Sequence, residues 1–146
     1  MNALRKLYKE LTSLHWEIGF LDNTFEGIVR GDKLKLTLVT HNFPNSWFAD
    51  PFILDVTDDT IIVLVEEVTK KISKGRISKL VIDRRNNYVI EKKVILERPG
   101  HLSFPIIYRK DDKIYVYPEN SEDGVLNILS LIHISEPTRL GMISYA

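Results

Sequence analysis

The chain contains 146 residues, with 20 Lys and Arg against 20 Asp and Glu, so its formal net charge at pH 7 is zero. This balance excludes the basic excess that attracts nucleic acids or anionic membranes. Cysteine is absent, which excludes disulfide bonds, thiolate metal sites and cysteine nucleophiles. A chain of this length corresponds to one domain.

The N-terminal segment carries apolar residues at helical spacing. Leu4, Leu7, Leu11 and Leu14 are separated by polar and charged residues, and the spacing predicts a short amphipathic helix within residues 1–14. No run of ~20 apolar residues and no signal peptide is recognised. We therefore expect no membrane span and a cytoplasmic protein.

After this segment the hydrophobic pattern changes to period two, which is typical of strands. His15–Leu21 and Lys33–Val39 are predicted strands, and Arg30–Asp32 is predicted to form a turn between them.

The middle of the chain has a more regular pattern of short strands and turns. Four strands are predicted in succession, at Asp50–Val56, Ile61–Thr69, Arg76–Asp83 and Tyr88–Leu96. Asp, Asn and Gly residues separate them, as expected for tight turns. Four antiparallel strands joined in this way form a meander, the unit that builds one blade of a β-propeller.

The same pattern begins again further along the chain. Pro51-Phe52-Ile53 and the following Asp58-Asp59 match Pro105-Ile106-Ile107 and Asp111-Asp112, with offsets of 54 and 53 residues. Self-similarity at this period is typical of repeated blades. The alternative is that two hairpins of separate origin both contain an Asp-Asp turn. We predict an all-β fold, a fragment of about two blades, over residues 15–128.

Residues 129–146 depart from this pattern. Leu129–Arg139 resembles the in-frame translation of a transposon-end sequencing adapter, and Ile143–Ala146 resembles the adapter that follows the index. We therefore expect a non-native tail over residues 129–146, to which no functional residue is assigned.

Four segments carry a resemblance to a known family: Trp47–Phe52, Glu66-Glu67, Leu96–Pro105 and Tyr117–Ser121. Together they resemble the propeller domain at the N-terminal side of the glucosamine inositolphosphorylceramide transferases and of related bacterial proteins. The resemblance covers about residues 15–128. It implies a five-bladed β-propeller of the superfamily that includes arabinanases, glycoside hydrolase family 43 and invertases.

Glycoside hydrolysis requires two carboxyl groups, one as acid and one as base or nucleophile. Asp50 matches the Asp that is base or nucleophile in the hydrolase relatives, and Glu119 is the candidate acid. The alternative for Asp50 is a turn cap or an ion pair. Glu119 and Glu66 occupy equivalent repeat positions, which also suits a structural role.

Five further residues are candidate sugar contacts. They are Trp47, Glu66, Glu67, His101 and Ser103. The Trp47 side chain could stack on a sugar, but packing between blades is the favoured alternative. His101 could contact a ligand or be a structural histidine. No ligand spacing among the histidines supports a metal site, and no cofactor motif is present.

The leading hypothesis is a carbohydrate-active propeller fragment that binds or processes a glycan, in bacterial surface-glycan metabolism as the resemblance implies. The alternative is a non-catalytic propeller that binds sugar or acts as a scaffold for a fused or partner glycosyltransferase. A third hypothesis is that the fragment has no function of its own, because unclosed blades expose strand edges. Nucleic acid is not an expected partner.

Overall fold

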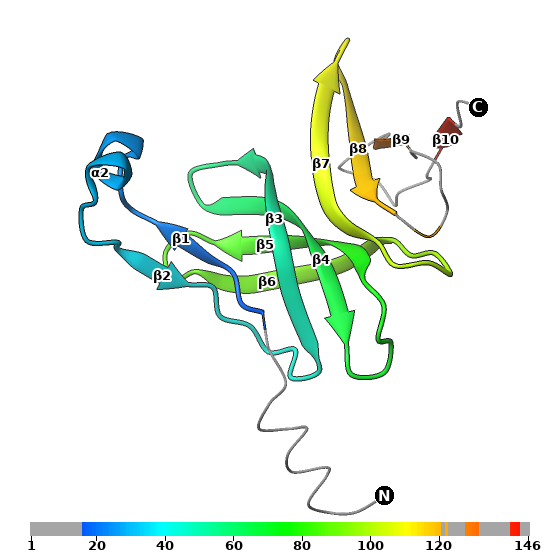
Figure 1. Ribbon diagram of the computed structural model, residues 1–146, viewed down its shortest axis with the longest axis horizontal. Helices are drawn as coiled ribbons and strands as arrows, with labels where there is room; N and C mark the ends of the chain where they lie inside the picture. Colours follow the sequence, from blue (N-terminus) through cyan, green and yellow to red (C-terminus); the bar gives the residue numbers. More distant parts are fainter. Residues whose placement is uncertain (1–15, 121, 123–127, 132–140, 144–146) are drawn as a thin grey trace, which may run out of the picture.

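The computed structural model describes residues 16–120, 122, 128–131 and 141–143, and these form an all-β fold with one short helix (Figure 1). The helix predicted within residues 1–14 lies outside the described residues. No helix in the described part of the chain is long and apolar enough to span a membrane.

The first sheet is a meander of four consecutive antiparallel strands: β3 (Ser46–Val56), β4 (Thr60–Thr69), β5 (Arg76–Asp83) and β6 (Tyr88–Leu96). The predicted bounds of β5 and β6 are confirmed, and β3 begins at Ser46 rather than at Asp50. The extension pairs Ser46 and Trp47 with the end of β4.

The second sheet repeats this topology along the chain. It contains β7 (Ser103–Lys110), β8 (Lys113–Glu119), β9 (Ile128–Leu131) and β10 (Gly141–Ile143), each antiparallel to the next. The predicted Asp111-Asp112 turn is confirmed, and both of its residues have positive φ, 50° and 58°. β9 and β10 include residues of the predicted non-native tail, and β9 pairs with β8. The non-native origin of the tail stays a prediction.

A small hairpin precedes the first sheet. Its strands are β1 (Gly19–Leu21) and β2 (Leu36–Leu38), which are shorter than predicted. Between them lies α2 (Phe25–Arg30), a helix that the sequence analysis did not predict. Thr24 caps its first turn by accepting a hydrogen bond from Gly27, and Gly31 ends it in a left-handed conformation at φ 82°. A helix of six residues is too short to show helical periodicity.

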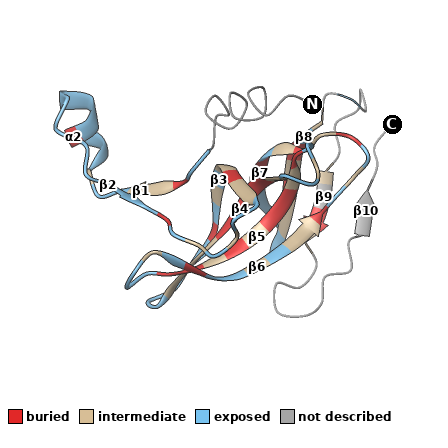
Figure 2. Cartoon of the chain, turned by 90° about the horizontal axis from the view of Figure 1, so that it is seen from below, coloured by how far each residue is buried: buried red, intermediate tan, exposed pale blue. Residues whose placement is uncertain are grey.

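Apolar side chains cover both faces of the first sheet, because alternate residues of β4 point in opposite directions. Val63 and Val65 belong to an apolar cluster that also contains residues of the hairpin and its flanking segments. Leu64 belongs to a second apolar cluster, which also contains residues of the second sheet. Buried residues are concentrated along β4 and β5 (Figure 2). The first sheet therefore lies between the hairpin and the second sheet, as Figure 1 also shows.

The first strand of each sheet contains the same irregularity. Asp50 (φ 49°) and Phe104 (φ 48°) both adopt left-handed backbone just before a proline. At both places the register with the next strand shifts, between Ala49 and Phe52 and between Ser103 and Ile106. Such bulges redirect a strand, and their equivalent positions extend the sequence repeat to backbone geometry.

Candidate functional site

The Glu66 cluster consists of Asp50, Glu66, His101 and Glu119, and lies where β3 and β7 contact each other. Ala49 pairs with Glu66 across β3 and β4, and the bulge at Asp50 follows immediately. The neighbouring carboxyl groups of Asp50 and Glu119 act on Glu66 and favour a proton on its side chain.

The electrostatics of the Glu66 cluster favour that proton at neutral pH. Burial raises the pKa of Glu66 to about 7, with further contributions from the hydrogen bond to Asp50, the charge of Asp50 and the charge of Glu119. The Glu66 side chain is only 11% exposed. A carboxyl group near half-protonation at pH 7 can both donate and accept a proton.

His101 contacts Glu66 from the connection between β6 and β7. Its Nε2 lies 3.1 Å from Glu66 Oε1. Its Nδ1 accepts a hydrogen bond of 2.9 Å from the backbone N–H of Gly75, in the loop between β4 and β5. The imidazole therefore bridges a backbone amide and a carboxyl group.

Gly75 is required by the close approach of these groups. A Cβ at this position would lie 2.3 Å from the carbonyl oxygen of Leu102, 2.5 Å from Glu66 Oε1 and 2.9 Å from His101 Cε1. The first of these is backbone and cannot rotate away. Any side chain at position 75 would displace the residues that hold the Glu66 cluster together.

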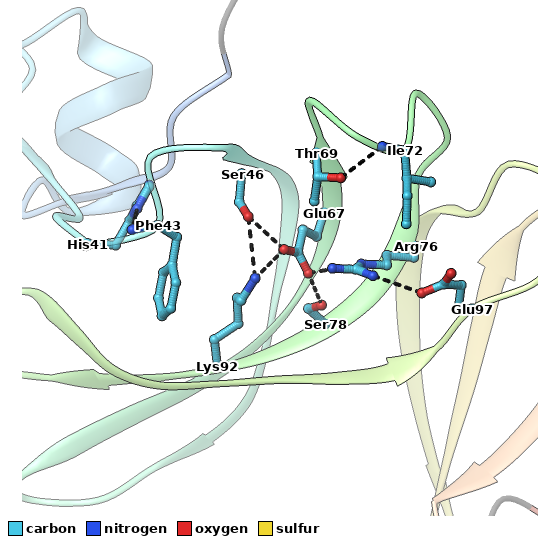
Figure 3. Close-up of polar contacts among 10 residues, drawn as sticks. All are labelled: His41, Phe43, Ser46, Glu67, Thr69, Ile72, Arg76, Ser78, Lys92 and Glu97. Carbon is cyan, nitrogen blue, oxygen red and sulfur yellow. Dashed lines mark hydrogen bonds and ion pairs between the residues drawn. The ribbon is translucent and has the colours of Figure 1, made fainter.

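Glu67 lies on the opposite face of β4 and has different surroundings. Its fully buried carboxylate accepts hydrogen bonds from Ser46 Oγ (2.8 Å), Ser78 Oγ (2.6 Å), Arg76 Nε (3.2 Å) and Lys92 Nζ (Figure 3). Burial alone would raise the pKa of Glu67, but these four donors outweigh it and lower the pKa to about 2. The Glu67 network, as we call these five residues, joins all four strands of the first sheet or their ends.

Two aromatic rings, one from β3 and one from β7, contact each other between the two sheets. Phe52 and Phe104 meet edge to face, with ring centroids 5.0 Å apart. Phe104 is 45% exposed and occupies the repeat position equivalent to Asp50. The sequence analysis missed this pair, because residues 52 apart in the chain meet only when the two sheets pack.

The predicted site residues divide into two groups. Asp50, Glu66, His101 and Glu119 come together in the Glu66 cluster, and Ser103 lies directly opposite Glu119 in the register of β7 and β8.

Trp47 and Glu67 do not join that cluster. Trp47 pairs with Val68 near the end of β3, on the same face as Glu66 by alternation. Glu67 faces away, and period two along β4 was the signal that could have separated it from Glu66. Among the described residues, no group of three or more His, Cys, Asp or Glu side chains could hold a metal ion.

Comparison with known proteins identifies the family of the chain. Residues 35–139 match the family described as glucosamine inositolphosphorylceramide transferase 1, N-terminal. The chain belongs to this family.

One curated member is glucosamine inositolphosphorylceramide transferase 1 of Arabidopsis thaliana, which is 28% identical to the chain over 90 residues. The aligned region covers 62% of the chain and 12% of the plant protein, so the chain corresponds to a small part of that relative. No solved structure matches. The predicted relation to the N-terminal domain of these transferases is thus confirmed, and the propeller architecture stays a prediction.

Proposed function

We propose that the chain forms part of a glycan-binding domain and that the Glu66 cluster contacts the sugar. The observation that carries the proposal is the Glu66 cluster, in which the His101 Nε2 lies 3.1 Å from Glu66 Oε1 and neighbouring carboxyl groups raise the pKa of Glu66 to about 7; the exposed ring of Phe104 on β7 adds to it. A sugar presents hydroxyl groups that both donate and accept hydrogen bonds, and a carboxyl group near half-protonation offers both functions. The aromatic ring offers an apolar surface for the face of a sugar ring.

The family supports the same class of ligand. The plant relative is named glucosamine inositolphosphorylceramide transferase 1, and the matched family is described as the N-terminal part of such a protein. We propose that the domain acts alongside a fused or partner glycosyltransferase by binding its acceptor or product.

Hydrolysis is the second candidate, with Asp50 as base or nucleophile and Glu119 as acid. Its support is that Glu66, with a pKa of about 7, could supply a proton at neutral pH. Hydrolytic carboxyl pairs are separated by ~5–10 Å so that they flank the bond. Asp50 and Glu119 are the pair proposed for this role.

We also propose that the two sheets are consecutive blades of a five-bladed propeller. The supporting observations are the repeated four-stranded topology, the equivalent bulges at Asp50 and Phe104, and the packing of one sheet on the next. An experimental structure of a longer homologous protein tests this directly. A sandwich or an open array in place of five blades around an axis would refute it.

The binding proposal is tested with a glycan array probed with the full chain and with three variants. Asp50→Asn and Glu66→Gln each change a carboxyl group of the cluster to an amide, and affinity should fall about tenfold or more. Glu91→Gln is the matched control, because Glu91 is exposed and forms an ion pair with Lys79 on β5. Binding that survives both cluster substitutions would exclude this site.

Turnover decides between the two candidates. Incubation of bound glycans with the chain, followed by product analysis, should show no cleavage if the domain only binds. Cleavage that is lost in both Asp50→Asn and Glu119→Gln would establish the hydrolytic role instead.

A further inference from the structure

We propose that the outer face of the β1–β2 hairpin is a docking surface for residues 1–14 of the same chain. This outer face carries Leu21, Leu34, Leu36 and Leu38 and is called the leucine face here. The proposal does not depend on glycan binding, because the hairpin and the Glu66 cluster lie on opposite sides of the first sheet (Figure 1).

The inner face of the hairpin already has a partner. In an antiparallel pair, residues that lie directly opposite each other share a face. Phe20 lies opposite Thr37, and alternation adds Ile18 and Val39 to the same face. Ile18 and Val39 are buried in the apolar cluster of the first sheet, and Phe20 packs against that cluster. The hairpin therefore covers the first sheet with one face only.

The leucine face is the other side of the same strands. Leu21 lies opposite Leu36, and Leu38 lies opposite Gly19. Leu34 continues the alternation of β2, and all four leucine residues are between 45% and 58% exposed. Figure 2 also shows β2 as exposed. Neighbouring apolar side chains that remain exposed mark a contact surface in a soluble protein.

The occupant is inferred from the chain that immediately precedes the hairpin. Residues 1–15 lie outside the described part of the chain and end directly before Trp16. They carry four leucines at helical spacing: Leu4, Leu7, Leu11 and Leu14. A helix is about 15 Å long from Leu4 to Leu14, and β2 is about 13 Å long from Leu34 to Leu38. The two rows of leucines therefore match in length.

The connection between the two rows has a suitable length. Residues 15–18 join the N-terminal segment to β1, and four residues reach at most about 14 Å. Packed layers of secondary structure lie about 10 Å apart, so the chain can turn back over the hairpin. Leu38, at one end of the leucine face, lies opposite Gly19, where β1 begins. The leucine face thus adjoins the end of the segment.

The test uses the absence of cysteine, because a single introduced thiol is then unique in the full chain. Leu36→Cys places the thiol on the leucine face, and Ile90→Cys on β6 is the matched control, because Leu36 and Ile90 are both 58% exposed. The alkylation rate of each folded protein by iodoacetamide is divided by its rate in urea. We expect Leu36→Cys to react at least about tenfold more slowly than Ile90→Cys.

Two double substitutions in the Leu36→Cys protein identify what protects the thiol. Leu7→Gln with Leu11→Gln keeps good helix formers but removes apolar contacts, so protection should be lost. Arg5→Gln with Lys9→Gln changes the opposite side of the helix and should leave protection intact.

Three results would overturn the proposal. The first is an equal alkylation rate for Leu36→Cys and Ile90→Cys, which would show that the leucine face is open in this chain. The second is protection that survives Leu7→Gln with Leu11→Gln; if it also increases with protein concentration, the occupant is a second copy. The third applies if a variant does not fold, and is the absence of nuclear Overhauser contacts between leucine methyl groups of residues 1–14 and those of β2 in the unsubstituted chain.

Discussion

Glu66 and Glu67 are neighbours in the chain, yet their carboxyl groups have opposite properties. Glu67 is surrounded by donors and stays ionised, with a pKa of about 2. Glu66 is surrounded by other carboxyl groups, and its pKa rises to about 7. Both are buried, so burial does not distinguish them.

The difference comes from what each face of β4 meets. Alternation sends Glu67 toward Ser46, Arg76, Ser78 and Lys92 of its own sheet, and Glu66 toward the second sheet. A buried acid with enough donors stabilises a structure, whereas one among acceptors is kept protonated and available for chemistry. The comparison assigns stability to one face and the candidate site to the other.

The largest effect is expected from removing the Glu67 carboxylate. Glu67→Ala leaves Arg76 and Lys92 with a buried partner missing, and should lower the free energy of unfolding by on the order of 3–5 kcal/mol. Urea denaturation followed by tryptophan fluorescence measures it. Glu91→Ala, at an exposed ion pair with Lys79, should cost no more than about 1 kcal/mol. Equal losses in both variants would remove the structural role given to Glu67.

Glu67 and Glu66 should affect the pH dependence of the unfolding free energy in opposite directions: Glu67 gives an acid limb, and Glu66 gives a limb at higher pH, called here the alkaline limb. The lowered pKa of Glu67 contributes stability that is present above its unfolded value of 4.5 and is lost as pH falls toward 2, by roughly 3 kcal/mol. The raised pKa of Glu66 contributes stability that is present below 4.5 and is lost as pH rises toward 7. The contribution of these two groups to stability should therefore be greatest near pH 4.5.

Urea unfolding midpoints measured across this pH range separate the contribution of Glu67 from that of Glu66. Glu66→Gln should flatten the alkaline limb and leave the acid limb intact. Asp83, whose pKa is lowered to about 2 by hydrogen bonds from Arg85, adds to the acid limb, and Arg85→Ala identifies its share. A Glu66→Gln protein with an unchanged alkaline limb would contradict the electrostatics described for the Glu66 cluster.

A smaller effect is expected from crowding the Glu66 face. Gly75→Ala places a Cβ against the Leu102 carbonyl and should cost about 1–3 kcal/mol in unfolding free energy. Gly100→Ala is the matched control, because its nearest neighbours are side-chain atoms at 3.2 Å that can move. The expectation fails if the two substitutions are equally tolerated.

The smallest effect concerns the aromatic pair. Phe104→Leu keeps an apolar side chain but removes the edge-to-face contact with Phe52, at a cost of about 0.5–1.5 kcal/mol. Phe25→Leu tests an exposed phenylalanine on α2 and should be close to neutral. Glycan affinity of Phe104→Leu, measured on the same array, should fall even where stability barely changes, and an unchanged affinity would remove the ring from the proposed site.

The sequence predicted those parts of the fold that depend on local patterns. Turn residues and period two placed β5 and β6 correctly. The repeat pointed to Glu66 and Glu119, and the family resemblance pointed to Asp50. What it could not predict depends on long-range packing. The donors of Glu67 are spread from Ser46 to Lys92, and no local pattern marks them as partners.

Two further features, one in the hairpin and one in the Glu66 cluster, could not be predicted from sequence periodicity. α2 depends on the cap at Thr24 and the left-handed Gly31, which are single positions rather than a period. The contact of His101 with Gly75 and Glu66 joins two loops that are apart in the sequence. Period two in β4 was available, however, and would have separated Glu66 from Glu67.

The matched bulges at Asp50 and Phe104 show that the same backbone feature can be repeated in two sheets while the side chain that it presents differs. Each bulge is a backbone device made by a left-handed residue before a proline, and it turns one side chain out of the ordinary alternation of the strand. In one copy that side chain is a carboxyl group, and in the other it is an aromatic ring. When such a unit is duplicated, the copy keeps the bulge. The residue at the bulge can then change from an acid to an aromatic residue while the backbone of the strand stays the same.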